Sequence, residues 1–211
     1  MNSVELKCQC GAFRGTIANI AAVRGRRTVC MCADCQAYAH YLGQAPLVLD
    51  ENGGTDVLPI APSNLKITQG AEHLKCMRLS EKGMLRWYAG CCKTPIANTT
   101  PMAKLPFAGV VQAIVNLDDD QIRDAAFGPI GMRVQAKSGI GKIPEGSYQK
   151  GSMKLIFQTI GFLVTGLLKR QYAPSPFFNS QTGAPSVSPH VLTVEERQAL
   201  GPLCGPNPVK T

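Results

Sequence analysis

Nine cysteines are the residues of this 211-residue sequence best suited to chemistry. Seven of them form three groups, which are Cys8-Gln9-Cys10, Cys30-Met31-Cys32-Ala33-Asp34-Cys35 and Cys91-Cys92. Residues i and i+2 of a strand point to the same face, so the first two cysteines of each early group can bind one ion. A two-residue turn brings Cys35 to the same point. Thiolates in a tetrahedral arrangement favour Zn²⁺, with an iron–sulfur cluster as the lesser alternative.

Disulfides explain this pattern less well than metal binding does. Nine is an odd number, and a C-x-C pair closes a cramped disulfide ring. Residues 1–7 lack the basic segment followed by an apolar run that a secretory signal requires. We therefore expect a cytoplasmic protein with reduced thiols, in which the cysteines bind metal.

The order of the three groups resembles a known family. C-x-C-G at Cys8–Gly11, C-x-C-x-x-C-[QR] at Cys30–Gln36 and a late cysteine pair before Thr94 are similar to the glutathione-dependent formaldehyde-activating family. That family includes centromere protein V, and the shared order spans residues 4–99. The resemblance implies a β-tent-like fold of small antiparallel sheets around two zinc ions per chain. It also implies a structural zinc on Cys8, Cys10 and the late cysteines, and a catalytic zinc on the ligands Cys30, Cys32 and Cys35.

The late cysteine pair departs from the family pattern, which is usually C-x-x-C-G-T. Ala89 stands where the first cysteine of that pattern belongs, and Cys92 matches the second. Cys91 could replace the first cysteine from a neighbouring position. Because adjacent residues of a strand point in opposite directions, both can bind only if the backbone turns, and Gly90 would permit such a turn. Which of Cys91 and Cys92 binds metal stays open at this point.

Three protein ligands leave a fourth zinc position for a substrate, whereas four ligands close the site. At Cys30, Cys32 and Cys35 a substrate thiol could enter as a thiolate, its pKa lowered by the metal. With the resemblance, this predicts a zinc-dependent carbon–sulfur lyase acting on a glutathione-type thiol–aldehyde adduct. The alternative is a non-catalytic, zinc-stabilised protein-interaction module. In that case one of His40, His73 or Cys76 could fill the open position.

Arginines precede the second cysteine group by only a few residues. Arg24, Arg26 and Arg27 could bind a carboxylate of a glutathione-like substrate bidentately. The alternative is a solvated basic turn. The overall charge of +8 is spread along the chain, and the cysteine spacing fits no C₂H₂ finger, so no nucleic-acid partner is expected.

The elements that must position the cysteines are short strands broken by turns. Alternating or apolar runs predict strands at residues 4–8, 13–17, 28–30, 47–49, 65–69, 74–79, 85–89 and 107–117, with a short helix from Asp34 to Leu42. These features predict a mainly β, zinc-binding domain over residues 4–117. Residues 118–211 are expected to form a loop-rich extension packed on it, with one apolar helix near 153–170. The apolar stretch is shorter than the ~20 residues that a membrane span needs.

Overall fold

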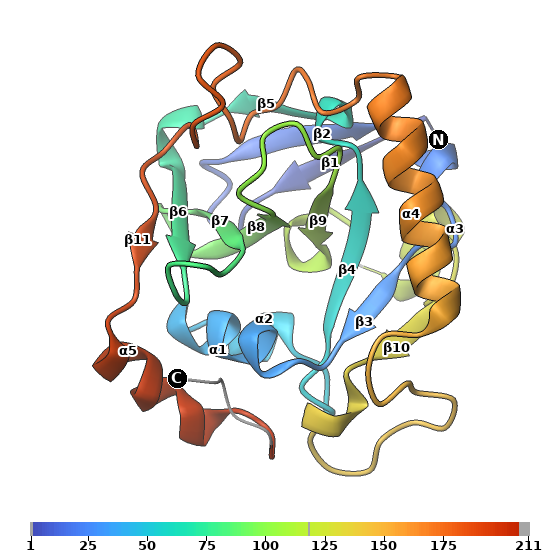
Figure 1. Cartoon of the computed structure of the whole chain (residues 1–211), viewed down its shortest axis with the longest axis vertical. Helices are drawn as coiled ribbons and strands as arrows, with labels where there is room; N and C mark the ends of the chain where they lie inside the picture. Colours follow the sequence, from blue (N-terminus) through green and yellow to red (C-terminus); the bar gives the residue numbers. More distant parts are fainter. Residues whose placement is uncertain (1, 118, 207–211) are drawn as a thin grey trace.

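The computed structural model describes residues 2–117 and 119–206, and their strands form two sheets (Figure 1). The smaller sheet holds β1 (Ser3–Lys7), β2 (Arg14–Ala18) and β5 (Leu65–Gln69) in the order β1-β2-β5. Both pairs are antiparallel, with Val4 opposite Ile17 in the first. The alternation predicted for these segments holds, because Val4, Leu6 and Ile17 point into the core while their neighbours face outward.

The larger sheet has eight strands among the described residues. Their order is β10 (Met132–Val134), β3 (Thr28–Cys30), β4 (Thr55–Ile60), β9 (Ala108–Val111), β8 (Thr94–Thr99), β7 (Leu85–Ala89), β6 (Leu74–Arg78) and β11 (His190–Val191). The inner pairs are antiparallel, whereas the edge strands β10 and β11 pair in parallel with β3 and β6. Both edge strands come from residues after 118. The division into 4–117 and 118–211 stays a prediction.

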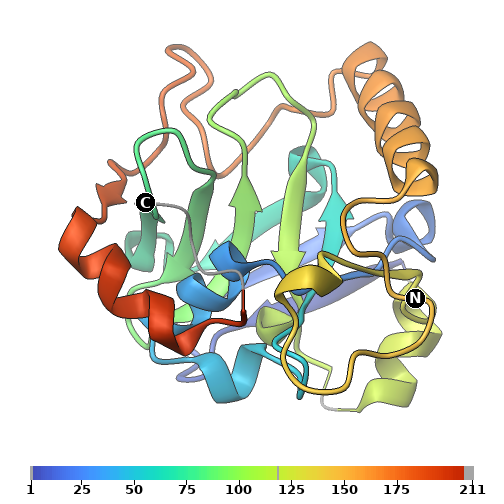
Figure 2. The same ribbon diagram turned by 60° about the horizontal axis from the view of Figure 1, so that its bottom comes forward.

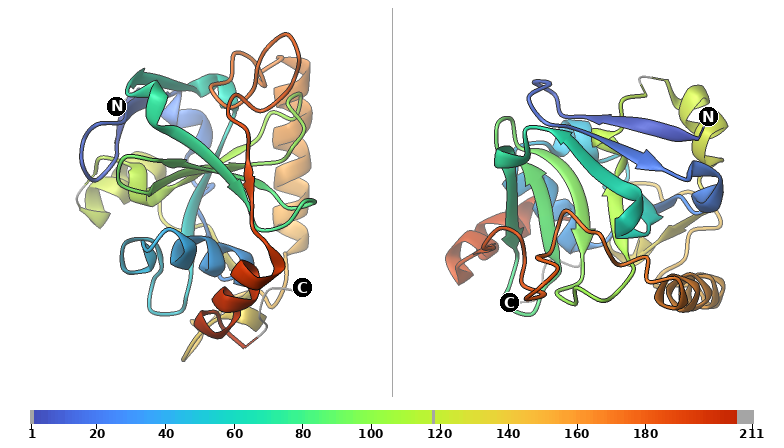
Figure 3. Two further views of the ribbon diagram at one scale, coloured as in Figure 1. Left: turned by 90° about the vertical axis from the view of Figure 1, so that its left-hand side faces the viewer. Right: turned by 90° about the horizontal axis from the view of Figure 1, so that it is seen from above.

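Helices cover one end and one side of the large sheet. They are α1 (Ala33–Tyr41), α2 (Ala45–Val48), α3 (Asp120–Phe127), α4 (Met153–Leu168) and α5 (Val194–Leu200). Single turns of 3₁₀ helix occur at Ile20–Val23, Pro62–Asn64, Ala71–His73, Gln112–Ile114, Ala136–Ser138 and Gly201–Leu203. Helices α1 and α2 lie beneath the end of the sheet, and α4 stands beside β3 and β4 (Figure 1). Seen along its own axis, α4 occupies one corner of the molecule (Figure 3).

The core lies between the sheets and extends under the C-terminal segment. Trp87 is fully buried on β7, and its indole N–H donates to Thr99 Oγ1 at 2.9 Å. Phe177 packs on the Trp87 ring with centroids 5.0 Å apart. A second apolar cluster joins α1 to Leu192 and Leu200, which places α5 against α1 (Figure 2). Residues near the end of the chain thus help to hold the helix that carries Cys35.

The fold is mixed α/β and strand-rich, which is broader than the predicted mainly β class. Two of the segments predicted as strands differ from the sequence expectation. Residues 47–49 were expected to form a strand, but Ala45–Val48 form α2, because Pro46 fits the first turn of a helix. The strand expected over 107–117 is limited to Ala108–Val111, and a 3₁₀ turn follows it.

The apolar helix expected near 153–170 is α4, which spans Met153–Leu168. Its Ser152 N-cap side chain accepts a hydrogen bond from the Leu155 N–H at 3.0 Å. Within the described ranges, no helix combines the length and the apolar character needed to cross a bilayer.

Candidate metal centres

Four of the predicted ligands meet where the small sheet approaches the β7–β8 turn. Cys8 Sγ lies 3.6 Å from Cys10 Sγ and 3.7 Å from Cys91 Sγ, and Cys91 Sγ lies 3.8 Å from Cys92 Sγ. The four sulfur atoms all lie within 4.8 Å of one another. Zn–S bonds of about 2.3 Å in a tetrahedron place sulfurs about 3.8 Å apart. This four-cysteine cluster therefore fits a tetrahedral zinc ion.

A tight turn after β1 presents Cys8 and Cys10. Gly11 adopts φ +77°, and its N–H donates to the Cys8 carbonyl at 2.9 Å, while the Cys8 N–H donates to the Phe13 carbonyl at 3.1 Å. The Phe13 N–H also donates to Cys8 Sγ at 3.2 Å. Such N–H···S bonds fix the orientation of a thiolate ligand.

The turn between β7 and β8 brings both late cysteines into the cluster. The backbone reverses at Cys91-Cys92-Lys93, and the Lys93 N–H donates to the Ala89 carbonyl at 2.7 Å. The left-handed residue of this turn is Lys93, with φ +60°, and not Gly90 as the sequence suggested. Thr94 links the turn that carries Cys8 and Cys10 to the β7–β8 turn. Its Oγ1 accepts a hydrogen bond from the Gln9 N–H at 3.1 Å and lies 3.1 Å from Cys92 Sγ.

The environment of Cys92 favours its thiolate. Burial alone would raise the pKa of Cys92, but hydrogen bonds from Thr94 and from the backbone lower it to about 6. Burial raises the pKa of Cys8. The metal-free cluster is therefore ready to hold one negative charge at Cys92, and a metal ion would have to displace the other thiol protons.

Cys30, Cys32 and Cys35 form a second cluster, in which the three sulfur atoms also lie within 4.8 Å of one another. Strand β3 ends at Cys30, Cys32 is the N-cap of α1, and Cys35 lies in its first turn. The Cys32 carbonyl accepts from the Cys35 N–H at 3.0 Å. The start of a helix favours negative charge, which suits thiolates. Among the described residues, no other Cys, His, Asp or Glu belongs to this three-cysteine cluster.

Arg86 is a residue of the candidate site that the sequence did not reveal. It lies on β7 with 3% of its surface exposed, and its Nη1 is 4.0 Å from Cys35 Sγ. The guanidinium also donates to Asn98 Oδ1 at 3.3 Å and lies 5.2 Å from the centroid of the Tyr38 ring. No local motif predicts this contact, because Arg86 is 51 residues from Cys35 in the sequence.

The positive charge of Arg86 and the negative charge of the cysteine thiolates stabilise each other. Hydrogen bonds from Cys30 and Cys32, together with the positive charge of Arg86, hold the pKa of Cys35 well below its ordinary value. Burial would lower the pKa of Arg86, but the negative charges of Cys35, Cys32 and Asp34 raise it. A zinc ion with three thiolates carries one net negative charge, which Arg86 would offset. The donor set and its counter-charge therefore both fit zinc.

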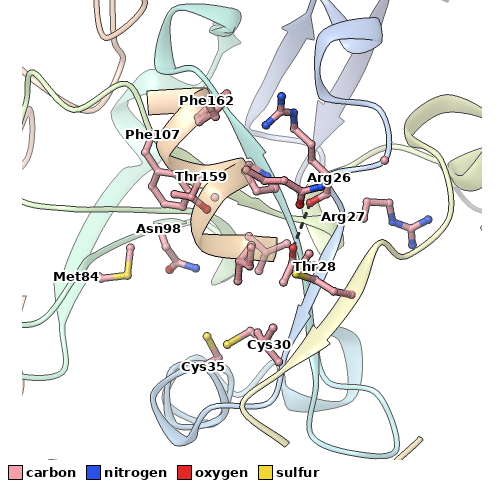
Figure 4. A pocket seen from close by; sticks show the side chains of 18 residues that line it. Arg26, Arg27, Thr28, Cys30, Cys35, Met84, Asn98, Phe107, Thr159 and Phe162 are labelled. Carbon is pink, nitrogen blue, oxygen red and sulfur yellow. Dashed lines mark hydrogen bonds between the residues drawn. The ribbon is translucent and has the colours of Figure 1, made fainter. Parts of the chain in front are cut away.

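A cavity of about 300 Å³ opens onto the three-cysteine cluster. Figure 4 shows Cys30 and Cys35 at one end, with their sulfur atoms turned toward each other, and Arg26 and Phe162 toward the other end. The walls come from β3, β4 and β10 and from the inner side of α4. Cys30 and Cys35 are thus within reach of a small molecule, whereas the four-cysteine cluster has its own complete set of sulfurs.

Gln36, which follows Cys35, anchors the cluster to distant segments. Its Nε2 donates to the carbonyls of Met31 and Ser138, both at 2.8 Å, and its Oε1 accepts from the Gly205 N–H at 2.7 Å. Gln36 is completely buried. The glutamine of the C-x-C-x-x-C-[QR] pattern therefore fixes the start of α1 rather than contributing a ligand atom.

The arginines before β3 have three different environments. Arg27 is buried and forms ion pairs with Asp56 and Asp124. Arg24 donates to the Ala125 carbonyl at 2.9 Å. Arg26 lines the cavity, with its guanidinium carbon 5.2 Å from the centroid of the Phe162 ring. Arg26 is thus the arginine of this turn placed to meet a ligand without breaking a salt bridge to a described residue.

The residues considered for a fourth ligand lie elsewhere. Cys76 is buried on β6, and burial raises its pKa to about 12. His73 lies 3.7 Å from Glu72, and neither His73 nor His40 belongs to a described cysteine cluster. Cys204 packs behind α1, where its Sγ contacts the Leu200 carbonyl at 3.3 Å. The three-cysteine cluster therefore keeps three protein ligands among the described residues.

Fold and clusters define a strand-rich α/β protein with two candidate metal centres. The chain belongs to the DUF6151 family, a family of unknown function whose model matches residues 1–188. No curated protein matches the sequence. A structural-genomics crystal structure of a Rhodobacter sphaeroides protein is similar, with 18% identity over 60% of this chain and 96% of that chain, and a TM-score of 0.39.

Proposed function

We propose that the protein is a zinc-dependent carbon–sulfur lyase that acts on a thiol–aldehyde adduct at Cys30, Cys32 and Cys35. The observation that carries the proposal is the cavity that opens onto a three-thiol cluster. Cys8, Cys10, Cys91 and Cys92 are proposed to hold a closed, structural zinc. The β-tent-like arrangement and the relation to the formaldehyde-activating family are part of this proposal and rest on the order of the cysteines.

The proposed reaction releases an aldehyde from a 1-hydroxyalkyl thioether, which is a hemithioacetal. The carbon–sulfur bond breaks, its electron pair leaves with the sulfur, and the hydroxyl group loses its proton as the carbonyl forms. The released proton and thiolate balance the step, and addition is the reverse. Zinc, when bound, supplies a Lewis acid with a coordination position open to the sulfur.

The chain's own residues would position the substrate and balance its charge. Cys30 and Cys35 line the end of the cavity where the substrate sulfur would lie. Arg86 holds a fixed positive charge 4.0 Å from Cys35 Sγ and would stabilise the added negative charge of a thiolate. Asn98 accepts a hydrogen bond from Arg86 and also lines the cavity, so it orients the guanidinium toward the site.

Cobalt substitution tests the proposal directly. We expect the absorption spectrum of the cobalt-loaded protein to change when a thiol is added, because the sulfur enters the open position. Cys35→Ser should abolish this change, whereas Cys204→Ser, a half-buried thiol outside both clusters, should leave it intact. The wild-type protein should also accelerate exchange between the thiol, formaldehyde and their adduct relative to Cys35→Ser. An unchanged cobalt spectrum with every thiol would overturn the proposed lyase.

A second candidate is a non-catalytic zinc module that binds a protein. The outer face of α4 favours it, because Met153, Phe157 and Leu168 are 64%, 68% and 81% exposed. This candidate predicts that zinc stabilises the fold while thiols leave the cobalt spectrum unchanged. The same titration therefore separates the two functions.

A further inference from the structure

The walls of the cavity beside Cys30 and Cys35 are mostly apolar. Between the cysteine end and Arg26, apolar side chains from β4, β10, α4 and the intervening loops predominate, and they include Val57, Met84, Phe107, Met132, Leu155 and Phe162. The polar side chains of Thr28, Asn98, Gln158 and Thr159 lie among them. Leu155 and Phe162 lie two turns apart on α4 and both line the cavity. Figure 4 shows Phe162 at the end of the cavity away from the cysteines. Such walls gain free energy from an apolar ligand in proportion to the area removed from water.

Charged partners for a ligand are scarce in the described part of this cavity. Its charged lining residues are Arg26 and Arg27. Arg27 is already engaged with Asp56 and Asp124, which leaves Arg26 at the end remote from the cysteines. A glutathione-type ligand brings two carboxylates and an ammonium group. Burying these against apolar walls without partners is unfavourable.

The cavity is partly open to solvent, and its size limits the part of the ligand that it can enclose. Its volume of about 300 Å³ is at the small end of the range for ligand pockets. A cavity of about 150 Å³ lined by apolar side chains holds a benzene molecule. The present cavity therefore suits a thiol whose substituent is a single ring or a branched alkyl group. Room remains for the sulfur and the aldehyde carbon at the cysteine end.

We propose that the thiol at this site carries a compact, apolar body, either aromatic or branched alkyl, instead of a glutathione-type peptide. This inference rests on the proposed function, because it assumes that the sulfur binds at Cys30, Cys32 and Cys35. The body would lie between β4 and the inner side of α4. The inference narrows the proposed substrate class to adducts of small apolar thiols.

Spectral titration of the cobalt-loaded protein with benzyl mercaptan, 2-mercaptoethanol and glutathione tests the inference. We expect half-saturation by benzyl mercaptan at a concentration at least tenfold below that of glutathione. Leu155→Glu should raise the half-saturation concentration of benzyl mercaptan at least tenfold and leave that of 2-mercaptoethanol unchanged. Phe157→Glu is the matched control, because it places the same charge on the exposed face of α4 and should change neither value. Thr159→Glu, at a half-buried polar position of the cavity wall, provides a second variant if Leu155→Glu does not fold.

The outcomes separate the inference from the proposed function. Equal half-saturation by glutathione and benzyl mercaptan, or equal effects of Leu155→Glu and Phe157→Glu, would overturn the apolar-thiol inference and leave thiol binding in place. A cobalt spectrum that no thiol changes would overturn the proposed function. Calorimetry with benzyl alcohol, which lacks sulfur, then reports on the cavity alone. If Leu155→Glu weakens the binding of benzyl alcohol and Phe157→Glu does not, the apolar preference of the cavity is still supported.

Discussion

At the residue scale, Arg86 places a full positive charge where side chains are rarely charged. We expect Arg86→Leu to lower the zinc affinity of the three-cysteine cluster at least tenfold, because removing one partner of a buried charge pair costs about 3–5 kcal/mol. Arg86→Lys should retain part of the affinity, since it keeps the charge and loses the planar donor group. Competition with a chromophoric chelator measures both values.

The four-cysteine cluster serves as the internal control for Arg86. Its zinc affinity should be unchanged in both variants, because the contacts of Arg86 are with Cys35, Asn98 and Tyr38. Equal loss of zinc from the two clusters would show that Arg86 supports the fold as a whole and has no particular role at Cys35.

The two clusters should also differ in their contribution to stability. Zinc analysis of protein purified without chelator should return two ions per chain, and each cysteine variant should lose one. We expect Cys8→Ser to lower the free energy of unfolding by more than about 3 kcal/mol, because a closed zinc site contributes directly to folding. Cys32→Ser should lower it less, since Cys32 is half-buried and its cluster opens onto a cavity. Thermal unfolding measures both losses, and equal destabilisation of the two variants would contradict the division into structural and open sites.

The sequence could predict which cysteines meet, but not what surrounds them. Ligand spacing is local for Cys8 with Cys10 and for Cys30 with Cys32 and Cys35, and the late pair falls in a turn between two strands. The counter-charge at Arg86 depends on how β7 packs against α1, and the cavity depends on α4, which is more than 115 residues after Cys35 in the sequence. Contacts of this kind leave no periodic or compositional signal.

At the element scale, the β7–β8 turn stores a small strain at Lys93. A side chain with a β-carbon in the left-handed conformation costs about 1 kcal/mol relative to glycine. We expect Lys93→Gly to preserve or slightly raise the melting temperature, and Lys93→Val to lower it and to weaken zinc binding at Cys91 and Cys92. Calorimetric melting with and without a chelator checks both effects. A Lys93→Val protein as stable as the wild type would contradict the assigned strain.

Four strands of the large sheet, β4, β8, β10 and β11, were missing from the sequence prediction, and proline accounts for the first two. β4 and β8 contain Pro59 and Pro95, and proline argues against a central strand. In the structure, β3 pairs with β4 at residues 55–57, before Pro59 is reached. At Pro95 the register between β7 and β8 shifts, which accommodates the missing N–H. The strands β1 and β2 were predicted from their alternating apolar residues, because one face of each strand is buried.

At the scale of the whole molecule, Gly205 links the segment after α5 to Gln36, next to the three-cysteine cluster. A β-carbon at Gly205 would meet the Ser138 carbonyl oxygen at 2.0 Å, so Gly205→Ala must displace backbone and Gln36 with it. We expect a loss of about 1–3 kcal/mol in unfolding free energy and weaker zinc binding at the three-cysteine cluster.

Gly161→Ala is the matched control for this substitution. A β-carbon there meets nothing within 4 Å, and alanine favours the helical conformation of α4 by up to about 1 kcal/mol. Denaturant-induced unfolding measures the free energy of unfolding of both variants. A Gly205→Ala protein that matches Gly161→Ala would disprove the coupling between Gly205 and the cysteines.

The two clusters differ in the length of chain that each one closes. The three-cysteine cluster is complete within six consecutive residues, whereas Cys8 and Cys91 are 83 residues apart. During synthesis, the shorter cluster can capture an ion while most of the chain is still unmade, and the longer one must wait for the β7–β8 turn. The entropy of closing the longer loop also delays it in refolding. We therefore expect ordered assembly: an ion at the three-cysteine cluster can bind first, and an ion at the four-cysteine cluster, which would connect the two sheets, binds afterwards.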